Sequence, residues 1–401
     1  MSDNPSFCIP LAPPDYPFIG KHPYSVQFAL CFDQVLPPQP LKDALQQTLI
    51  DFYPVAGVLH LEDNTVFIQQ QSKLVDLEVI EHPDGQDRPT AMLPSELAEF
   101  YLEVKAELHT PKPLARFCLH QFHNGSVLVV NISHCLVDGY SFFYFLSAWA
   151  KVCRGESYRV PCHDRHNLIP NIENVGDLAR VDDFDATFSH RTGLSIHQER
   201  QFANIAHIEW ESLLICNQEL DALRQSCHPQ KLSDNSILCA YLWKKYAQHW
   251  HHGSDSDLML QLTCAIDFRR IYRKVIPLNY FGNAIKGATC VLTLEQIQNL
   301  SLVEIGQHLQ LMVLGLRTTD IEQHLSYLEA YRHTYGMEKM SNLHVANPDT
   351  GLLVTNLSRL SLAELNFGQG SPLVLVPLVP AARVAVILPI HAALTVTVAY
   401  P

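Results

Sequence analysis

Residues 126–139 read Ser-Val-Leu-Val-Val-Asn-Ile-Ser-His-Cys-Leu-Val-Asp-Gly and predict a strand, a turn and the start of a helix. The run from Val127 to Ile132 is apolar except for one asparagine, which predicts a buried strand. Gly139 permits a tight turn or a positive φ, and the apolar run from Ser141 to Val152 predicts a helix. We therefore expect His134 at a rigid strand–loop–helix junction.

A histidine at such a junction has two interpretations. The plainer one is a hydrogen-bonded histidine that ends a strand. The functional one is a general base, because imidazole titrates near neutral pH and the strand holds it in place. Cys135 suggests a Cys–His nucleophilic pair, but adjacent strand residues face opposite sides, so we interpret Cys135 as a small core residue. Asp138 either orients His134, as in a catalytic triad, or has a structural role, and the spacing alone leaves both open.

The flanking segments predict a mixture of strands and helices. In the first half, strands are expected at 25–32, 115–122 and 126–133 and helices at 41–52 and 96–108. The second and third of these strands are joined by His123-Asn124-Gly125, which is typical of a hairpin. In the second half, strands are expected at 206–216, 258–268, 351–357, 374–378, 383–390 and 393–400, and helices at 217–226, 236–249, 302–316 and 320–335. Because strands and helices do not alternate strictly, the fold class is α+β, with two similar α/β sandwiches.

The length of 401 residues favours two domains. From about Pro161 to Ser195 the periodicity is lost, and Pro, Asp, Asn and His dominate. We therefore expect an N-terminal domain over residues 1–165, a crossover linker over 166–205 and a C-terminal domain over 206–401.

Composition excludes several classes of protein. The chain has 28 Lys+Arg against 41 Asp+Glu and a net charge of −13, so a nucleic-acid partner is not expected. Its 11 cysteines are scattered without a CxxC pair, which favours reduced thiols and a cytoplasmic location. The N-terminus has no signal-peptide pattern, and prolines interrupt the apolar C-terminus, so no membrane partner is expected. The run His249-Trp250-His251-His252 is interpreted as a solvated helix end, and no metal site is predicted.

The pattern His134-x-x-x-Asp138-Gly139 after an apolar strand resembles the HxxxDG signature of the chloramphenicol-acetyltransferase-like acyltransferases. Further segments, in the same order along the chain, resemble one branch, the BAHD acyl-CoA-dependent acyltransferases. These segments are 41–59 (LKDALQQTLIDFYPVAGVL), 113–152, 236–243 (SILCAYLW), 267–283 (with DFR and YFGN) and 355–370 (TNLSRLSLAELNFGQG). The resemblance covers nearly the whole chain.

The resemblance implies a mechanism and a site. His134 would take the proton from an acceptor hydroxyl or amine, which would attack the acyl-CoA thioester without an acyl-enzyme. Asp138 would pair with Arg269 as a structural ion pair, and the hydroxyl of Thr355 would help hold the oxyanion. A channel between two chloramphenicol-acetyltransferase-like domains would admit donor and acceptor from opposite ends. Acyl-CoA would be a co-substrate, with no permanently bound cofactor, and the enzyme would be a monomer acting on a specialised metabolite.

Two departures from the family pattern affect these expectations. The usual DFGWG segment reads Asn366-Phe367-Gly368-Gln369-Gly370, which we expect to change local packing. Many members have a tryptophan in the acceptor pocket where this chain has Leu357, so the acceptor stays open. Two alternatives also stay open: a carrier-protein thioester as the donor, or a non-acylating relative that binds or cyclises its ligand.

Overall fold

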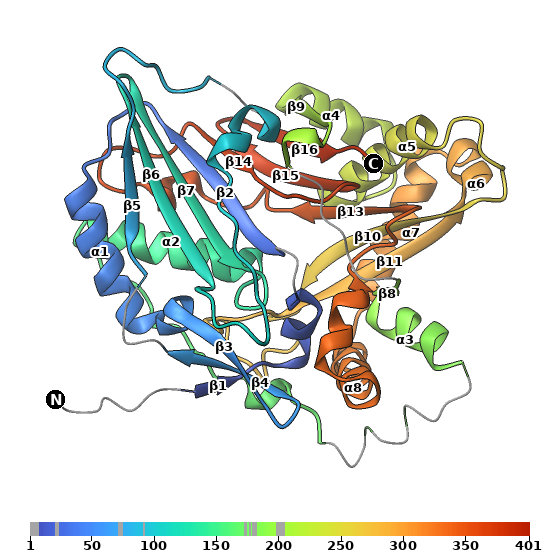
Figure 1. The fold of residues 1–401 in the computed structure, drawn as a ribbon. Helices are drawn as coiled ribbons and strands as arrows, with labels where there is room; N and C mark the ends of the chain where they lie inside the picture. Colours follow the sequence, from blue (N-terminus) through green and yellow to red (C-terminus); the bar gives the residue numbers. More distant parts are fainter. Residues whose placement is uncertain are drawn as a thin grey trace.

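The computed structural model describes residues 8–20, 24–70, 75–90, 93–171, 175, 178, 183–197 and 205–401. Its strands form two large sheets and two small ones (Figure 1). The strands are β1 (Cys8–Pro10), β2 (Ser25–Phe32), β3 (Gly57–Glu62), β4 (Thr65–Gln70), β5 (Leu77–Glu81), β6 (Ala115–Phe122), β7 (Gly125–Ser133), β8 (Ser195–Ile196), β9 (Trp210–Cys216), β10 (Met259–Asp267), β11 (Ile285–Thr293), β12 (Leu343–His344), β13 (Gly351–Asn356), β14 (Val374–Pro377), β15 (Val384–Ile390) and β16 (Ala393–Ala399). The α-helices are α1 (Pro38–Asp51), α2 (Gly139–Cys153), α3 (Phe184–Thr192), α4 (Asn217–Ser226), α5 (Asp234–Trp250), α6 (Leu294–Asn299), α7 (Leu302–Gly315) and α8 (Thr318–Tyr335).

The first large sheet has the strand order β14-β2-β7-β6-β5. Its central strand β7 is buried along its whole length, as the apolar run predicts. The hairpin between β6 and β7 closes where Phe122 pairs with Gly125, so the predicted turn is confirmed. Helices α1 and α2 pack together against one face of this sheet, and the buried Trp149 of α2 donates a 3.0 Å hydrogen bond from Nε1 to the carbonyl of Leu41 in α1 (Figure 1).

The second large sheet has the order β11-β10-β13-β15-β16-β9. Helices α5 and α7 supply the apolar side chains that cover it, among them Trp243 and Leu309. Strand β14 comes from the C-terminal half of the chain but pairs with β2 in the first sheet, in register from Val374 with Cys31 to Pro377 with Phe28. The two halves are therefore tied by main-chain hydrogen bonds, and the boundaries at residues 165 and 205 stay predictions.

The sequence prediction of a helix over residues 96–108 is wrong. Instead of a helix over residues 96–108, a 3₁₀ helix spans Pro94–Phe100 and the chain then runs extended. The burial of Leu102, Val104 and Ala106 alternates with more exposed neighbours, which is the period of an extended chain and not of a helix. The predicted linker contains α3 and β8 among its described residues, because Phe184 and Phe188 pack against the tyrosines of α8.

The other expectations from the sequence concern the histidine run at 249–252, membrane-spanning helices and metal sites. His251 is 9% exposed and its Nε2 lies 3.4 Å from Nη1 of Arg383, so the interpretation of that run as a solvated helix end is wrong for this residue. Within the described part of the chain, no helix has both the length and the apolar character to cross a membrane. The same residues contain no cluster of three or more His, Cys, Asp or Glu side chains arranged to hold a metal ion.

Candidate active site

His134 directly follows β7, and its main chain is fixed on both sides. Its amide donates to the carbonyl of Tyr24 at 3.0 Å, which extends the β2–β7 pairing by one residue. Its carbonyl accepts a 2.7 Å hydrogen bond from Nδ2 of Asn283. The imidazole stacks on the buried ring of Phe18, with centroids 3.8 Å apart and planes 16° apart. The position of the ring is therefore set by three separate segments of the chain.

Asp138 is completely buried and caps the helix that begins at Gly139. Its carboxylate accepts from Nη1 and Nη2 of Arg269 at 2.8 and 3.1 Å, and from the amides of Ser141 and Ala284 at 2.8 and 2.9 Å. A carboxylate has about four acceptor positions, so these four bonds use its capacity. Burial alone would raise the pKa of Asp138, but Arg269 and the two amides outweigh it and lower the pKa. This geometry favours the structural alternative for Asp138 over the orientation of His134.

Arg269 is 1% exposed and connects the HxxxDG loop to the second half of the chain. Besides Asp138, it donates to Oδ1 of Asp267, Oγ of Ser141 and the carbonyls of Tyr280 and Gly282. Burial opposes the charge on Arg269, but the two aspartates outweigh this effect and raise its pKa. The guanidinium therefore stays charged and links the loop, helix α2 and the YFGN segment.

A second buried ion pair, which the sequence did not reveal, supports the same loop. Nε of Arg165 lies 3.1 Å from Oδ2 of Asp15, and both side chains have no exposed surface. Asp15 also accepts a 2.8 Å hydrogen bond from Asn283, the residue that holds the carbonyl of His134. Nη2 of Arg165 donates to the carbonyl of Leu136 at 3.3 Å. The only sequence signal for this pair was a charged residue inside the apolar, proline-rich stretch around Asp15.

Cys135 has no exposed surface, and it accepts a hydrogen bond from Oγ of Ser133 at 3.2 Å. Burial raises the pKa of its thiol to about 12. A thiol that stays protonated is a poor nucleophile. The structure therefore agrees with the interpretation of Cys135 as a core residue.

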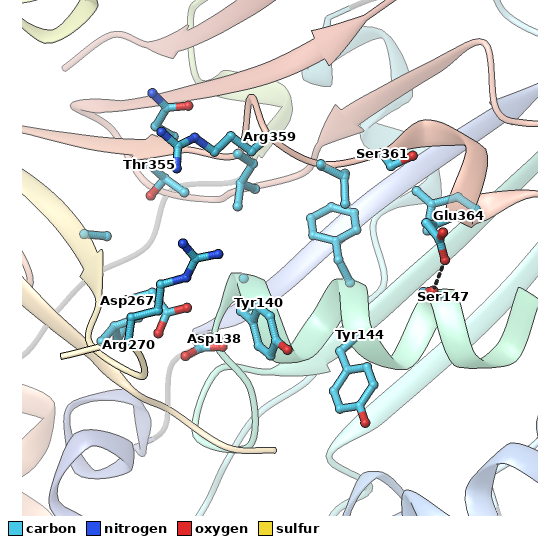
Figure 2. Close-up of a pocket in the computed structure, with 18 residues that line it drawn as sticks. Asp138, Tyr140, Tyr144, Ser147, Asp267, Arg270, Thr355, Arg359, Ser361 and Glu364 are labelled. Carbon is cyan, nitrogen blue, oxygen red and sulfur yellow. Dashed lines mark hydrogen bonds between the residues drawn. The ribbon is translucent and has the colours of Figure 1, made fainter. Parts of the chain in front are cut away.

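Two cavities meet at Gly139, Thr355 and Leu357. The wide one has a volume of about 590 Å³ and is lined by α2, the end of β10 and the segment after β13. Figure 2 shows Arg270 and Arg359 reaching into it from two of these elements, with Tyr140 and Tyr144 on the wall formed by α2. The narrow cavity has a volume of about 100 Å³, and His134 lines it. His134 and Thr355 line the same narrow cavity, and Thr355 and Leu357 also line the wide one.

Gly139 does not have the positive φ that the sequence suggested, because it is the first residue of α2 and lies outside the left-handed region. Its small size is needed for another reason. A Cβ atom at this position would lie 3.2 Å from Cδ2 of Leu357. Gly139 therefore lets Leu357 approach the helix where the two cavities join.

The altered segment 366–370 organises local packing. Oδ1 of Asn366 accepts hydrogen bonds from the amides of Gly368 and Gly370 at 2.8 and 3.0 Å. Phe367 packs edge-on against Trp149 and Phe32. Asparagine thus shapes this turn through its own side-chain oxygen.

The family model described as "Transferase family", that of the BAHD acyltransferases, matches residues 17–398 of this chain. The chain belongs to this family. Members transfer acyl groups from acyl-CoA to small-molecule acceptors, so the expectation of an acyl-CoA-dependent acyltransferase is confirmed at this level.

The relatives of this BAHD acyltransferase are distant in sequence, and each match covers most of both chains. A hydroxycinnamoyltransferase from Narcissus pseudonarcissus is 25% identical over 84% of this chain and 78% of its own. Vinorine synthase from Rauvolfia serpentina is 22% identical over 89% of this chain and 78% of its own. TRI101 of F. graminearum, solved with coenzyme A and T-2 mycotoxin, has a TM-score of 0.76 at 16% identity and covers 98% of this chain and 95% of its own. This likeness confirms the predicted two-domain fold class.

The ion pair in this BAHD acyltransferase predicts a large loss of stability for Asp138→Asn. The variant leaves a buried guanidinium without its main counterion, which typically costs about 3–5 kcal/mol. Asp267→Asn is the matched control, because Asp267 also pairs with Arg269 but is 41% exposed, and it should cost about 1 kcal/mol or less. Urea unfolding measures both. Equal stabilities of Asp138→Asn and the wild type, with slower catalysis, would restore the orienting role of Asp138.

The contact between Gly139 and Leu357 predicts a steric effect of Gly139→Ala. The new methyl group should displace the Cδ2 end of Leu357 by a few tenths of an ångström at the junction and lower kcat/KM for the acceptor severalfold, with little change in stability. Adding Leu357→Ala should recover most of this loss, because it removes the side chain that the methyl group displaces. Steady-state kinetics of the wild type, both single variants and the double variant test the coupling. Additive effects would show that the two residues do not share this contact.

Proposed function

We propose that this protein transfers an acyl group from acyl-CoA to a hydroxyl, or an amine, of a small specialised-metabolite acceptor, with His134 as the general base. The main support for this proposal is the location of His134. It lies in a narrow cavity that opens at Gly139, Thr355 and Leu357 into a wide one. Two substrates in two connected cavities can react directly, and their proximity supplies much of the rate enhancement.

The wide cavity suits the donor. Its volume of about 590 Å³ falls within the range of about 300–1,000 Å³ for small-molecule sites. The exposed arginines Arg270 and Arg359 can receive the negative groups of an acyl-CoA. Coenzyme A was bound in the solved structure of TRI101, which supports the same donor here as a co-substrate. The narrow cavity, with Leu357 on its wall, would then hold the acceptor.

The proposed reaction needs one base and one oxyanion donor. His134 takes the proton from the acceptor O–H as its oxygen attacks the thioester carbon. The hydroxyl of Thr355 donates to the carbonyl oxygen, which carries the negative charge of the tetrahedral intermediate. The C–S bond then breaks, the thiolate takes the proton from His134, and the ester and free coenzyme A leave. Asp138, Gly139 and Arg269 only hold the loop, so this proposal includes no acyl-enzyme.

A carrier-protein donor is the main alternative, and a non-acylating relative is the other. Assays with acyl-CoA and with an acylated carrier protein, each followed by release of free thiol, separate the two donors. Binding of acceptor without thiol release from either donor would favour the non-acylating alternative. A monomeric state and a cytoplasmic location stay predictions.

The role of His134 predicts that His134→Ala lowers kcat by at least about 100-fold, since a positioned base supplies about 10²–10⁴. The variant should stay folded, because the main-chain hydrogen bonds of residue 134 with Tyr24 and Asn283 remain. His123→Ala is the control, because His123 is exposed in the β6–β7 turn. Thiol release from a panel of acyl-CoAs with metabolite extract measures activity. Near-normal turnover by His134→Ala would overturn the assignment.

The proposed role of Thr355 predicts different values of kcat for two substitutions. Thr355→Val keeps the shape but removes the hydroxyl, and should lower kcat about 100-fold, as for loss of one oxyanion donor. Thr355→Ser keeps the hydroxyl and should retain most of the activity. Equal rates for both variants would show that the hydroxyl has no part in catalysis.

A further inference from the structure

The narrow cavity arises where the two large sheets separate. Strand β14 pairs with β2 only as far as Phe28, and one more hydrogen bond joins the amide of Leu378 to the carbonyl of Gln27 at 2.9 Å. Beyond this point residues 379–381 line the cavity and no longer pair with β2. The edge of β2 from Ser25 to Gln27 therefore faces β13 and β15 across the cavity, with His134 at one end.

Among the described residues, the wall of this cavity carries no fixed charge. Its apolar part includes Val26, Phe28, Leu353, Val384 and Val386. Its polar part, apart from His134, consists of neutral groups, namely Tyr24, Ser25, Gln27 and Thr355. No Asp, Glu, Lys or Arg belongs to the lining, as far as the described residues extend.

The charged groups lie on the other side of the junction. Asp267, Arg270, Arg359 and Glu364 all line the wide cavity (Figure 2). Gly139, Thr355 and Leu357 separate them from the narrow one. A ligand in the narrow cavity that reacts at His134 therefore meets these charges only through the junction.

The volume limits the ligand as well. The narrow cavity measures about 100 Å³. A cavity of about 150 Å³ lined by apolar side chains is known to take benzene. A group much larger than a short branched chain or a small ring would extend out of this space, for example through the junction with the wide cavity.

We infer that the part of the acceptor that carries the reacting hydroxyl or amine is compact, uncharged and largely apolar. This inference rests on the proposed function, because it takes the narrow cavity as the acceptor site. An ionised carboxylate in this cavity would lose hydration without meeting a Lys or Arg side chain among the described lining residues, which is strongly unfavourable. A neutral hydroxyl or carbonyl could instead be hydrogen-bonded by the neutral side chains of the wall. The arginines would serve the donor alone.

The first test compares two acceptors of nearly equal shape, 4-methylpentan-1-ol and 4-hydroxybutyrate. Each has seven non-hydrogen atoms, and they differ mainly in the charge at the end remote from the reacting hydroxyl. With acetyl-CoA and other short acyl-CoAs as donors, kcat/KM for the neutral alcohol should exceed that for the acid by about 100-fold or more. Equal or better use of 4-hydroxybutyrate would overturn the inference.

The second test places a cation in the cavity. Ala381 lines it from the segment after β14 and is half-buried, whereas its neighbour Ala382 is exposed and outside the lining. Ala381→Arg should reduce the preference for the neutral alcohol at least tenfold. Ala382→Arg, with the same added charge, should leave the preference unchanged. Similar shifts in both variants would show that the cavity does not set this selectivity.

The third test does not depend on turnover. Binding of both probes to the whole protein can be followed by saturation-transfer NMR, with Leu353→Trp as the variant that fills the cavity. The inference expects the neutral alcohol to bind the wild type, to lose binding in Leu353→Trp, and to bind more tightly than the acid. Preferential binding of the acid would overturn it. If the neutral alcohol binds but no His134-dependent thiol release is seen, the inference about the cavity holds and the proposed acyl transfer is wrong.

Discussion

The buried ion pair between Asp138 and Arg269 is the interaction on which the site depends. It closes the HxxxDG loop against the second half of the chain at a point without solvent, where Asp138 also caps α2. Burying two charges is costly, and the loss is recovered only when every hydrogen-bonding position is filled. Here the carboxylate accepts four bonds and the guanidinium reaches Ser141 and Gly282 as well. The pair therefore fixes one arrangement of the two halves.

A second hydrogen-bond network fixes the position of His134, as the first network fixes the start of α2. Asp15 holds Asn283, and Asn283 holds the carbonyl of His134, while Phe18 in the same short helix as Asp15 covers the imidazole. The loop that carries His134 is thus supported from the N-terminal segment and from the segment after β10. The proposed base requires rigid support of this kind, because small displacements of a reacting group are costly. The narrow and wide cavities are the spaces that remain once both networks are formed.

Several parts of the fold could be predicted because their signal is local. The apolar run before His134 and the turn His123-Asn124 fix β7 and its hairpin with β6. The helix expected over residues 96–108 does not form, because the carbonyls of Leu102 and Ala106 are bonded instead by the side chain of Asn131 and the amide of Gly20, which are distant in sequence. Strand β11, which has no strong alternation, was not predicted, since its place is set by pairing with β10.

Motifs in a fixed order are a one-dimensional signal, so the sequence alone indicated the family, the two-domain α+β fold and five candidate site residues, His134, Asp138, Arg269, Thr355 and Leu357. Which of these residues meet depends on the tertiary structure. It brought Asp15, Phe18 and Arg165 to the loop from distant segments, and it gave Gly139 a steric role beside Leu357 instead of a special φ. It also separated a charged cavity from an uncharged one. Such contacts join residues more than 100 positions apart, and no local pattern encodes a distance of that kind.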